Sequence, residues 1–175
     1  MNAENSADTE NAKMLSLSFS VLENIRDKDF RALQNMVHPE LGVTFSPYAT
    51  ISPTTDRHLT AAQVARLGTD TNVYIWGVYN GSGEPIELST EEFFVNYIKV
   101  AEFIDSTVIG INRIIRSGNA LENIAEIYPD AKFVDFHVSR GEPTDETDWS
   151  SLRLCFKEYN GNLRLIAIIY SSWTV

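Results

Sequence analysis

A β-hairpin near the end of the chain constrains the fold more than any other stretch. Asn160-Gly161 separates two runs, residues 151–159 and 162–170, in which apolar side chains recur at alternate positions. Asn-Gly favours a two-residue type I′ turn, because both central residues of that turn need a positive φ. The turn predicts three apolar pairs on one face: Phe156 with Leu165, Leu154 with Ala167, and Leu152 with Ile169. A slip by one residue would mix the two faces, so we expect this apolar face to lie in the core.

The rest of the chain predicts helices first, strands mixed with short helices in the middle, and strands last. Residues 12–26 and 29–38 have the apolar spacing of amphipathic helices, and residues 48–59 resemble a loop. Strands are predicted at residues 42–46, 73–79, 85–88, 107–115 and 132–139, and short helices at 60–68, 89–101 and 119–128. Because there is no regular βαβ alternation, we expect an α+β fold with N-terminal helices on a mainly antiparallel sheet.

The N-terminal segment differs in composition from the rest. Residues 1–11 are polar and low in complexity, so we expect a disordered tail there, followed by a single domain at residues 12–175. Residues 1–13 lack the apolar core of a signal peptide, and no apolar run reaches the ~18 residues that a membrane span needs. The chain is therefore expected to be either cytoplasmic or an exported domain whose signal or membrane tether is absent from this sequence.

The charge of the chain restricts its partners. With 24 acidic and 14 basic residues the net charge is −10, and Lys and Arg form no cluster in the sequence. An acidic surface repels phosphate backbones and anionic lipids, so we expect neither nucleic acid nor a membrane surface as a partner.

Asp135 and His137 are the strongest candidates for chemistry. They lie two residues apart in a predicted strand, so both side chains point to the same face. A carboxylate that orients an imidazole is the working part of many general-base sites. Arg153, in the hairpin, would approach the same face from a neighbouring strand. The alternative is that Asp135 and His137 are solvated on an outer face and that Arg153 pairs with the preceding acidic loop.

Aromatic residues supply the remaining binding candidates. Tyr79 would hold a substrate, and Trp76 and Trp173 are the other two aromatic candidates for contact with a ligand. Cys155 is the single cysteine of the chain, and we expect a small buried side chain there, because nothing nearby would activate a nucleophile.

No cofactor or metal site is predicted. The three histidines are far apart in the sequence, without an HxH or HxxxH spacing. The chain has no Gly-x-Ser-x-Gly nucleophile motif. Gly81-Ser-Gly83 lies in a predicted turn with no phosphate-binding helix behind it.

Five segments together resemble a group of uncharacterised bacterial proteins, many of which carry lipoprotein or secretion signals. The segments are His38–Tyr48, Trp76–Ile86, Tyr128–His137, Asp148–Leu154 and Trp173-Thr174. The resemblance implies a protein of the cell envelope or a secreted protein, and it supplies no catalytic residues. Tyr170-Ser-Ser-Trp173 departs from the relatives, which tend to have an acidic residue and often a histidine there. Any site at that position would be lost in this chain.

The order of elements also resembles the nuclear-transport-factor-two-like (NTF2-like, cystatin-like) superfamily. In that superfamily, N-terminal helices close one end of a strongly bent antiparallel sheet to make a cone. The predicted helix at residues 119–128 fits this pattern poorly. Such cones either bind and transform small molecules or serve as interaction modules, so the fold does not decide the function.

Two functions therefore stay open. The first is a non-catalytic binding or accessory domain of the cell envelope, with a small-molecule pocket and a homodimer contact through its sheet. The second is a small-molecule enzyme of the dehydratase, isomerase or hydrolase type, with His137 as the base and Asp135 as its orienter. A cavity lined by both residues, within hydrogen-bond reach of each other, would favour the enzyme.

Overall fold

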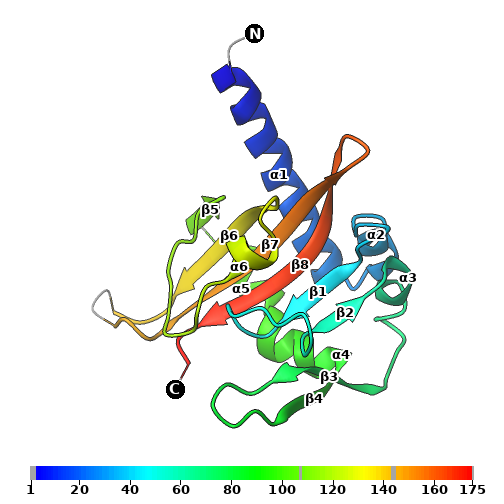
Figure 1. Ribbon diagram of the computed structural model, residues 1–175, viewed down its shortest axis with the longest axis vertical. Coiled ribbons are helices and arrows are strands. Elements are labelled where there is room, and N and C mark those ends of the chain that lie inside the picture. Colours follow the sequence, from blue (N-terminus) through cyan, green and yellow to red (C-terminus); the bar gives the residue numbers. More distant parts are fainter. Residues whose placement is uncertain (1–2, 107, 143–144, 175) are drawn as a thin grey trace.

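The computed structural model of the protein describes residues 3–106, 108–142 and 145–174, and Figure 1 shows its helices and strands. The main sheet has six strands in the order β2-β1-β8-β7-β6-β5, and β3 and β4 form a separate two-stranded sheet. Only β1 and β8 pair in parallel; the other described pairs are antiparallel. The α+β class predicted from the sequence is confirmed, with N-terminal helices packed on a mainly antiparallel sheet that ends in the hairpin.

The elements have the following bounds. The strands are β1 (Val43–Ser46), β2 (Arg57–Leu59), β3 (Val73–Val78), β4 (Pro85–Ser89), β5 (Val108–Ile111), β6 (Lys132–Ser139), β7 (Trp149–Tyr159) and β8 (Asn162–Ser172). The helices are α1 (Ala3–Arg26), α2 (Phe30–Gln34), α3 (Ala61–Val64), α4 (Thr90–Phe93), the π-helix η1 (Phe94–Ile98), α5 (Val100–Phe103) and α6 (Ile124–Ile127).

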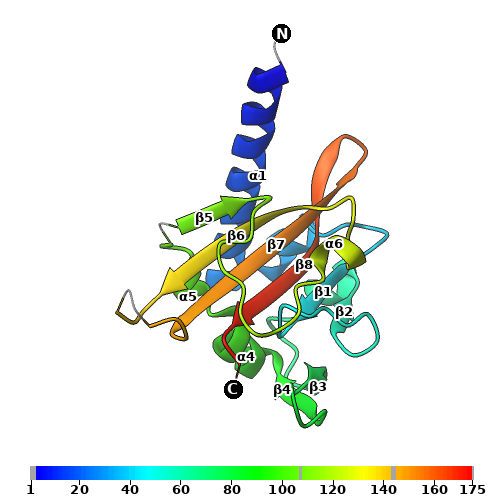
Figure 2. The same ribbon diagram turned by 60° about the vertical axis from the view of Figure 1, so that its left-hand side comes forward.

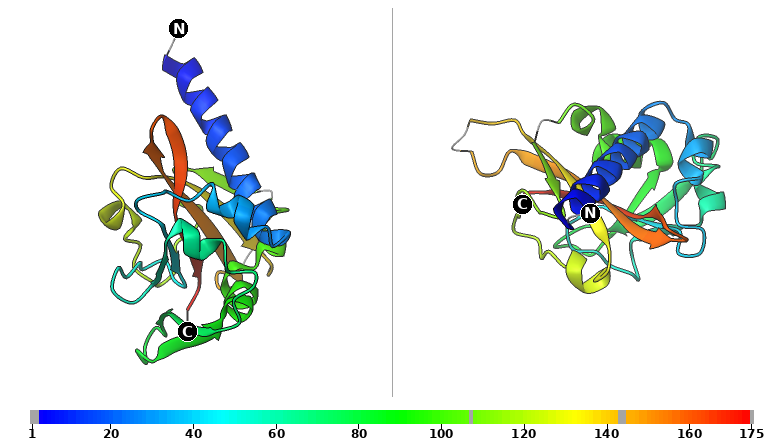
Figure 3. Two further views of the ribbon diagram at one scale, coloured as in Figure 1. Left: turned by 90° about the vertical axis from the view of Figure 1, so that its right-hand side faces the viewer. Right: turned by 90° about the horizontal axis from the view of Figure 1, so that it is seen from above.

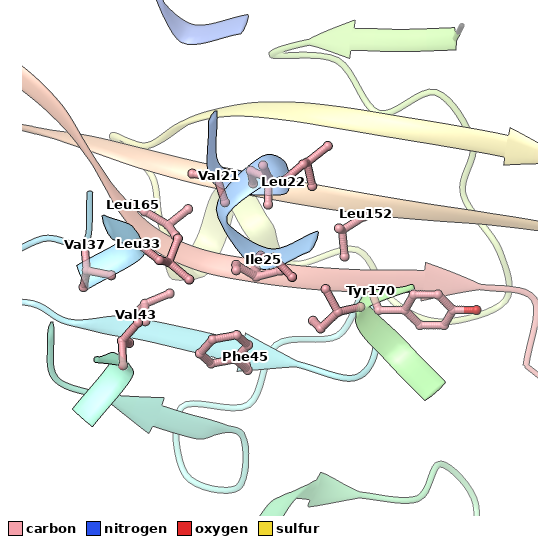
Figure 4. Packing of buried hydrophobic residues seen from close by; sticks show 14 of the residues in the cluster. Val21, Leu22, Ile25, Leu33, Val37, Val43, Phe45, Leu152, Leu165 and Tyr170 are labelled. Carbon is pink, nitrogen blue, oxygen red and sulfur yellow. The ribbon is translucent and has the colours of Figure 1, made fainter. Parts of the chain in front are cut away.

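The main hydrophobic core lies between the helices and one face of the sheet, which we call the helical face (Figure 4). Leu22 and Ile25 of α1 are buried there together with Phe45 of β1 and with Leu152 and Leu165 of the hairpin strands. The helices thus cover the face of β7 that was predicted to lie in the core, which carries Leu152, Leu154 and Phe156. Burial of each large aliphatic side chain contributes roughly 1.5–3 kcal/mol, so this layer supplies much of the stability of the fold.

The opposite face of the sheet is covered by residues 112–131, which we call the covering segment. Figure 3 shows α6, which belongs to this segment, and α1 on opposite sides of the sheet. A smaller apolar cluster holds the segment in place, and its buried members are Ile51, Ile124, Cys155, Ile166, Ala167 and Ile169. Both faces of the sheet are therefore packed, which means that polar side chains on the covered face are taken out of water.

The terminal hairpin has the predicted turn but only part of the predicted register. Asn160 and Gly161 have φ values of 50° and 77°, as a type I′ turn requires. Phe156 pairs with Leu165 as predicted, but the register then shifts, and Leu154 pairs with Ile168. The predicted pairs Leu154–Ala167 and Leu152–Ile169 are wrong, and the observed partner of Leu152 is Tyr170.

A β-bulge at Ile166 explains the difference. The bulge inserts one extra residue into β8, so the following residues change face. Ala167 and Ile169 consequently face the covering segment, while Ile168 and Tyr170 face the helices. Because this part of β8 is apolar on both faces, alternation of side chains could not reveal the insertion.

The N-terminal segment also differs from the prediction. Residues 3–11, expected to be part of a disordered tail, belong to α1, while Met1 and Asn2 lie outside the described residues. Figures 1 and 2 show this half of α1 extending beyond the sheet. Lengthening a helix that is already anchored costs far less than starting one, and Ala, Glu and Lys favour it. An ion pair between Glu10 and Lys132 of β6 adds a contact that the sequence could not indicate.

Other predicted boundaries also need correction. Residues 57–59, expected within a loop, form β2, because they pair with β1. The helix expected at residues 119–128 is a single turn, α6, and the strand expected at residues 107–115 is shortened to β5, while Thr107 lies outside the described residues. The chain after β5 forms the covering segment, where backbone groups bond to the sheet from outside.

Candidate functional site

Asp135 and His137 are buried on the covered face of the sheet and form no hydrogen bond with each other. Asp135 is fully buried and His137 is 7% exposed. Asp135 lies opposite Arg153 in the β6–β7 pairing, and the distance from Arg153 Nε to Asp135 Oδ1 is 3.3 Å. The imidazole of His137 instead lies between two hydroxyls, with Ser151 Oγ 3.0 Å from Nδ1 and Ser139 Oγ 2.9 Å from Nε2. The two side chains belong to separate polar networks.

Arg153 is the centre of a buried ionic network that ties the covering segment to the sheet. The guanidinium is fully buried and bonds to both carboxylate oxygens of Glu122, with Nη2 2.9 Å from Oε1. Arg153 therefore lies between one carboxylate from the sheet and one from the covering segment. The backbone N–H of Ile115 donates to Asp135 Oδ2 over 2.8 Å, which adds a second link across the same layer.

Burial sets the ionisation of this network. Burial raises the pKa of the Asp135 carboxyl to about 6, although Arg153 and the Ile115 N–H favour the charged form and limit the rise. Burial also lowers the pKa of the His137 imidazole, and the nearby Arg116, Arg140 and Arg153 lower it further. A neutral imidazole held between two serine hydroxyls satisfies its hydrogen bonds without a substrate.

We expect Asp135→Asn to remove a pH dependence of stability. The carboxyl pKa is about 6 in the folded protein against 3.8 for an unperturbed aspartate, so between these pH values the folded state binds the proton more tightly. Stability of the native protein relative to the variant should therefore fall as pH rises from about 4 to about 6, by roughly 3 kcal/mol. Urea unfolding of both proteins at half-unit pH steps measures the difference. A difference that stays flat, or that grows with pH, would contradict the buried-carboxyl assignment.

The other predicted binding residues lie apart from one another. Trp76 is fully buried in the main core, stacked on Phe93 with ring centroids 4.1 Å apart. Tyr79, just after β3, and Trp173, just after β8, are 43% and 41% exposed. None of the six residues predicted for a site lines either of the two cavities described next. The structure thus joins Asp135 with Arg153 and leaves the others separate.

The larger cavity is a groove on the outer side of the helical layer, which we call the helical groove. It has a volume of about 630 Å³ and lies between the end of α1, the segment after α3, and the run α4-η1-α5. Its apolar lining residues are Ile25, Phe30, Leu67, Phe94, Val95, Val100 and Ala101. Val95 is 67% exposed, which is unusual for a valine in a packed helix and leaves apolar surface open to a ligand.

Polar groups around the helical groove are mostly paired, with one exception. Lys28 forms an exposed ion pair with Glu91 over 3.4 Å. Thr90, in contrast, is 4% exposed, and its Oγ1 has no hydrogen-bond partner among the described residues. Buried hydroxyls are nearly always bonded, so the unpaired Thr90 hydroxyl is an exception within the packing beside the groove.

An irregular helix shapes the groove. η1 is a π-helix, and Lys99 after it takes a left-handed conformation with φ of 45°. Single π turns occur frequently at functional sites, because they displace the side chains that follow. This groove could not be predicted from the sequence, because its lining comes from residues 25–102 and depends on how distant segments pack. The only local signal was the exposed apolar Val95, which a helical wheel places off the buried face.

The second cavity, which we call the side pocket, has a volume of about 300 Å³ and lies beside the covering segment.

No described helix is long and apolar enough to cross a membrane. Within the described ranges, no three His, Cys, Asp or Glu side chains gather closely enough to hold a metal ion.

Comparison with known proteins gives two solved structures with a similar arrangement. One is an NTF2-like protein from Cytophaga hutchinsonii, with a TM-score of 0.40 and 15% identity, over 98% of this chain and 99% of that one. The other is called Rd1NTF2_05, with a TM-score of 0.33 and 10% identity, over 97% and 99% of the two chains. Both names carry the NTF2 designation. No protein-family model and no curated protein matches the chain.

Proposed function

We propose that this protein is a non-catalytic domain that binds a largely apolar small molecule in the helical groove. The observation that supports this most is the groove itself, with a volume of about 630 Å³ and an apolar lining. Binding sites for small molecules are typically ~300–1,000 Å³ and mostly apolar, with a few polar groups that fix orientation. Lys28 and Glu91 supply such groups, since both line the groove and are exposed.

The titratable residues favour binding over catalysis in this proposal. Asp135 faces Arg153 and His137 faces Ser139 and Ser151, so each has a structural partner. A general base needs hydrogen-bond reach to the proton it removes, and neither residue lines the helical groove. Replacement of His137 by alanine should accordingly leave ligand binding in the groove unchanged.

We further propose the cell envelope as the place of action, on the basis of the sequence resemblance and the acidic composition. Self-association through the sheet would use its edges, β2 and β5, because helices cover one face and the covering segment covers the other. An edge strand offers unpaired backbone groups to a second copy of the chain.

We expect Val95→Asp to weaken binding of an apolar probe by at least tenfold. The aspartate would place a charge on the apolar lining, where desolvation of a carboxylate opposes binding. Titration with 1-anilinonaphthalene-8-sulfonate, followed by its fluorescence, measures the change. Val108→Asp is the matched control, because Val108 is 45% exposed on β5 and lines neither cavity. Equal loss in both variants, or no saturable binding to the native protein, would reject the groove as the site.

A further inference from the structure

The side pocket lies where the covering segment meets β1, β2 and β8, on the opposite side of the sheet from α1. Its volume of about 300 Å³ is lined by Leu41, Thr44, His58, Ile127, Tyr128, Pro129, Asp130, Ala131, Lys157 and Ile166. Ile166, the bulge residue of β8, and Ile127 of α6 give it an apolar wall. No residue is shared with the helical groove, so this pocket is a separate feature.

Two opposite charges line the side pocket without partners. Lys157 and Asp130 are both exposed, and neither forms an ion pair or a hydrogen bond with a described residue or with each other. Lys157 lies directly across from Arg164 in the hairpin, and Arg164 donates to the backbone oxygen of Asn35 instead of to a carboxylate. Like charges placed opposite each other on a sheet cost stability, so packing of the fold does not account for this lysine.

Three polar side chains form another part of the wall. Thr44 Oγ1 lies 3.1 Å from His58 Nδ1, so these two side chains form a hydrogen bond whose direction depends on the tautomer of the imidazole. The third is the Tyr128 hydroxyl, and burial raises the pKa of its phenol, which keeps it protonated. The Tyr128 hydroxyl and the second ring nitrogen of His58 are therefore left to donate to a ligand or to accept from it.

We propose that the side pocket binds a free α-amino acid with an apolar side chain. The carboxylate of the ligand pairs with Lys157 and its ammonium group with Asp130, while Ile127 and Ile166 contact its side chain. A ligand with only a negative charge would leave the charge of Asp130 without a partner, and a ligand with only a positive charge would leave that of Lys157 without one. A ligand that carries both charges therefore fits best. The Tyr128 hydroxyl and the His58 imidazole, which line the same pocket, can hydrogen-bond to the same two groups.

Isothermal titration with L-phenylalanine and two derivatives tests the proposal. L-Phenylalaninamide lacks the carboxylate and N-acetyl-L-phenylalanine lacks the ammonium group, and each should bind at least tenfold more weakly than the free amino acid. Lys157→Met should bind L-phenylalaninamide as well as it binds L-phenylalanine. Asp130→Asn should bind N-acetyl-L-phenylalanine as well as it binds L-phenylalanine. Lys13→Met and Asp105→Asn are matched controls, because both residues are exposed and line neither cavity, and they should change nothing.

Three results would overturn the proposal. The first is no binding of phenylalanine up to ~10 mM, at the weak end of small-ligand affinities. The second is equal affinity for all three compounds, because recognition of both charges would then be absent. The third is loss of binding in Val95→Asp with no effect of Lys157→Met, which would move the ligand to the helical groove. Both replaced residues are exposed, and circular dichroism of the variants confirms that they fold.

Discussion

Arg153→Met is expected to lower the free energy of unfolding by about 3–5 kcal/mol at pH 7.5. Methionine keeps most of the volume of the side chain, but it removes the only cation that contacts Asp135 among the described residues. Asp135 is fully buried and cannot turn towards water, whereas Glu122 keeps 16% of its side chain exposed. The cost therefore comes mainly from an uncompensated carboxylate under the covering segment. Urea unfolding at pH 7.5 measures it.

The loss of stability in Arg153→Met should depend on pH and on the charge of its partner Asp135. At pH 5 a protonated Asp135 needs no cation, because burial holds its folded pKa at about 6, so the loss should be smaller. The double variant Arg153→Met with Asp135→Asn should be more stable than Arg153→Met alone, since both charges are then gone.

Arg26→Met is the control, because the Arg26–Asp27 pair is about half exposed, with side-chain exposures of 49% and 58%. Such surface pairs contribute at most ~1 kcal/mol. A similar loss in both variants would contradict the buried network.

Local sequence signals predicted the parts of the fold that depend on neighbouring residues. Thr60 with Gln63, and Ser89 with Glu92, form the two capping boxes that their spacing predicts. The Asn160-Gly161 turn has the expected positive φ values. In each case, the hydrogen bonds or dihedral angles that decide the structure lie within a few residues, so the sequence contains the whole interaction.

Features that depend on distant residues could not be predicted in the same way. Arg153 lies opposite Asp135, as its expected approach from a neighbouring strand implied, but it also bonds to Glu122, 31 residues away, whereas the alternative suggestion was a pair with the acidic loop just before β7. The suggestion failed because the covering segment folds back over the sheet, and no local pattern specifies that return. The same return explains why Asp135 and His137 are buried, although an outer sheet face would have left them solvated. Their catalytic role stays a prediction that only activity measurements can test.

The bulge at Ile166 shows how one inserted residue changes the face of the sheet on which the following side chains lie. An unbroken β8 would have placed Ala167 and Ile169 in the helical core. The extra residue turns them towards the covering segment, where they join Cys155 in the smaller apolar cluster. Ile166 itself keeps the face that an unbroken strand would give it and lies in the wall of the side pocket. A strand that is apolar on both faces permits this shift without exposing apolar surface, which explains why the sequence pattern is silent about it.

Trp76→Ala is expected to lower the free energy of unfolding by about 3–5 kcal/mol, the range for removal of a fully buried tryptophan. Trp76 was predicted from the sequence as a binding residue, but its indole is fully buried. It stacks on Phe93 at 4.1 Å, meets Phe45 edge-on at 5.7 Å, and donates from Nε1 to the backbone oxygen of Leu88 over 2.9 Å. The residue thus fixes the β3–β4 hairpin to the main core.

Two comparisons separate packing from ligand binding at this position. Tyr79→Ala removes an aromatic ring from the end of the same hairpin, but Tyr79 is 43% exposed, so the loss should stay below about 1 kcal/mol. Trp76→Phe keeps an aromatic ring against Phe93 but leaves the Leu88 oxygen without its donor, so its loss should lie between the other two. Urea unfolding followed by far-ultraviolet circular dichroism ranks the three variants. If Trp76→Ala costs no more than Tyr79→Ala, then the indole is not part of the core that holds the hairpin, and its assignment as a binding residue regains its support.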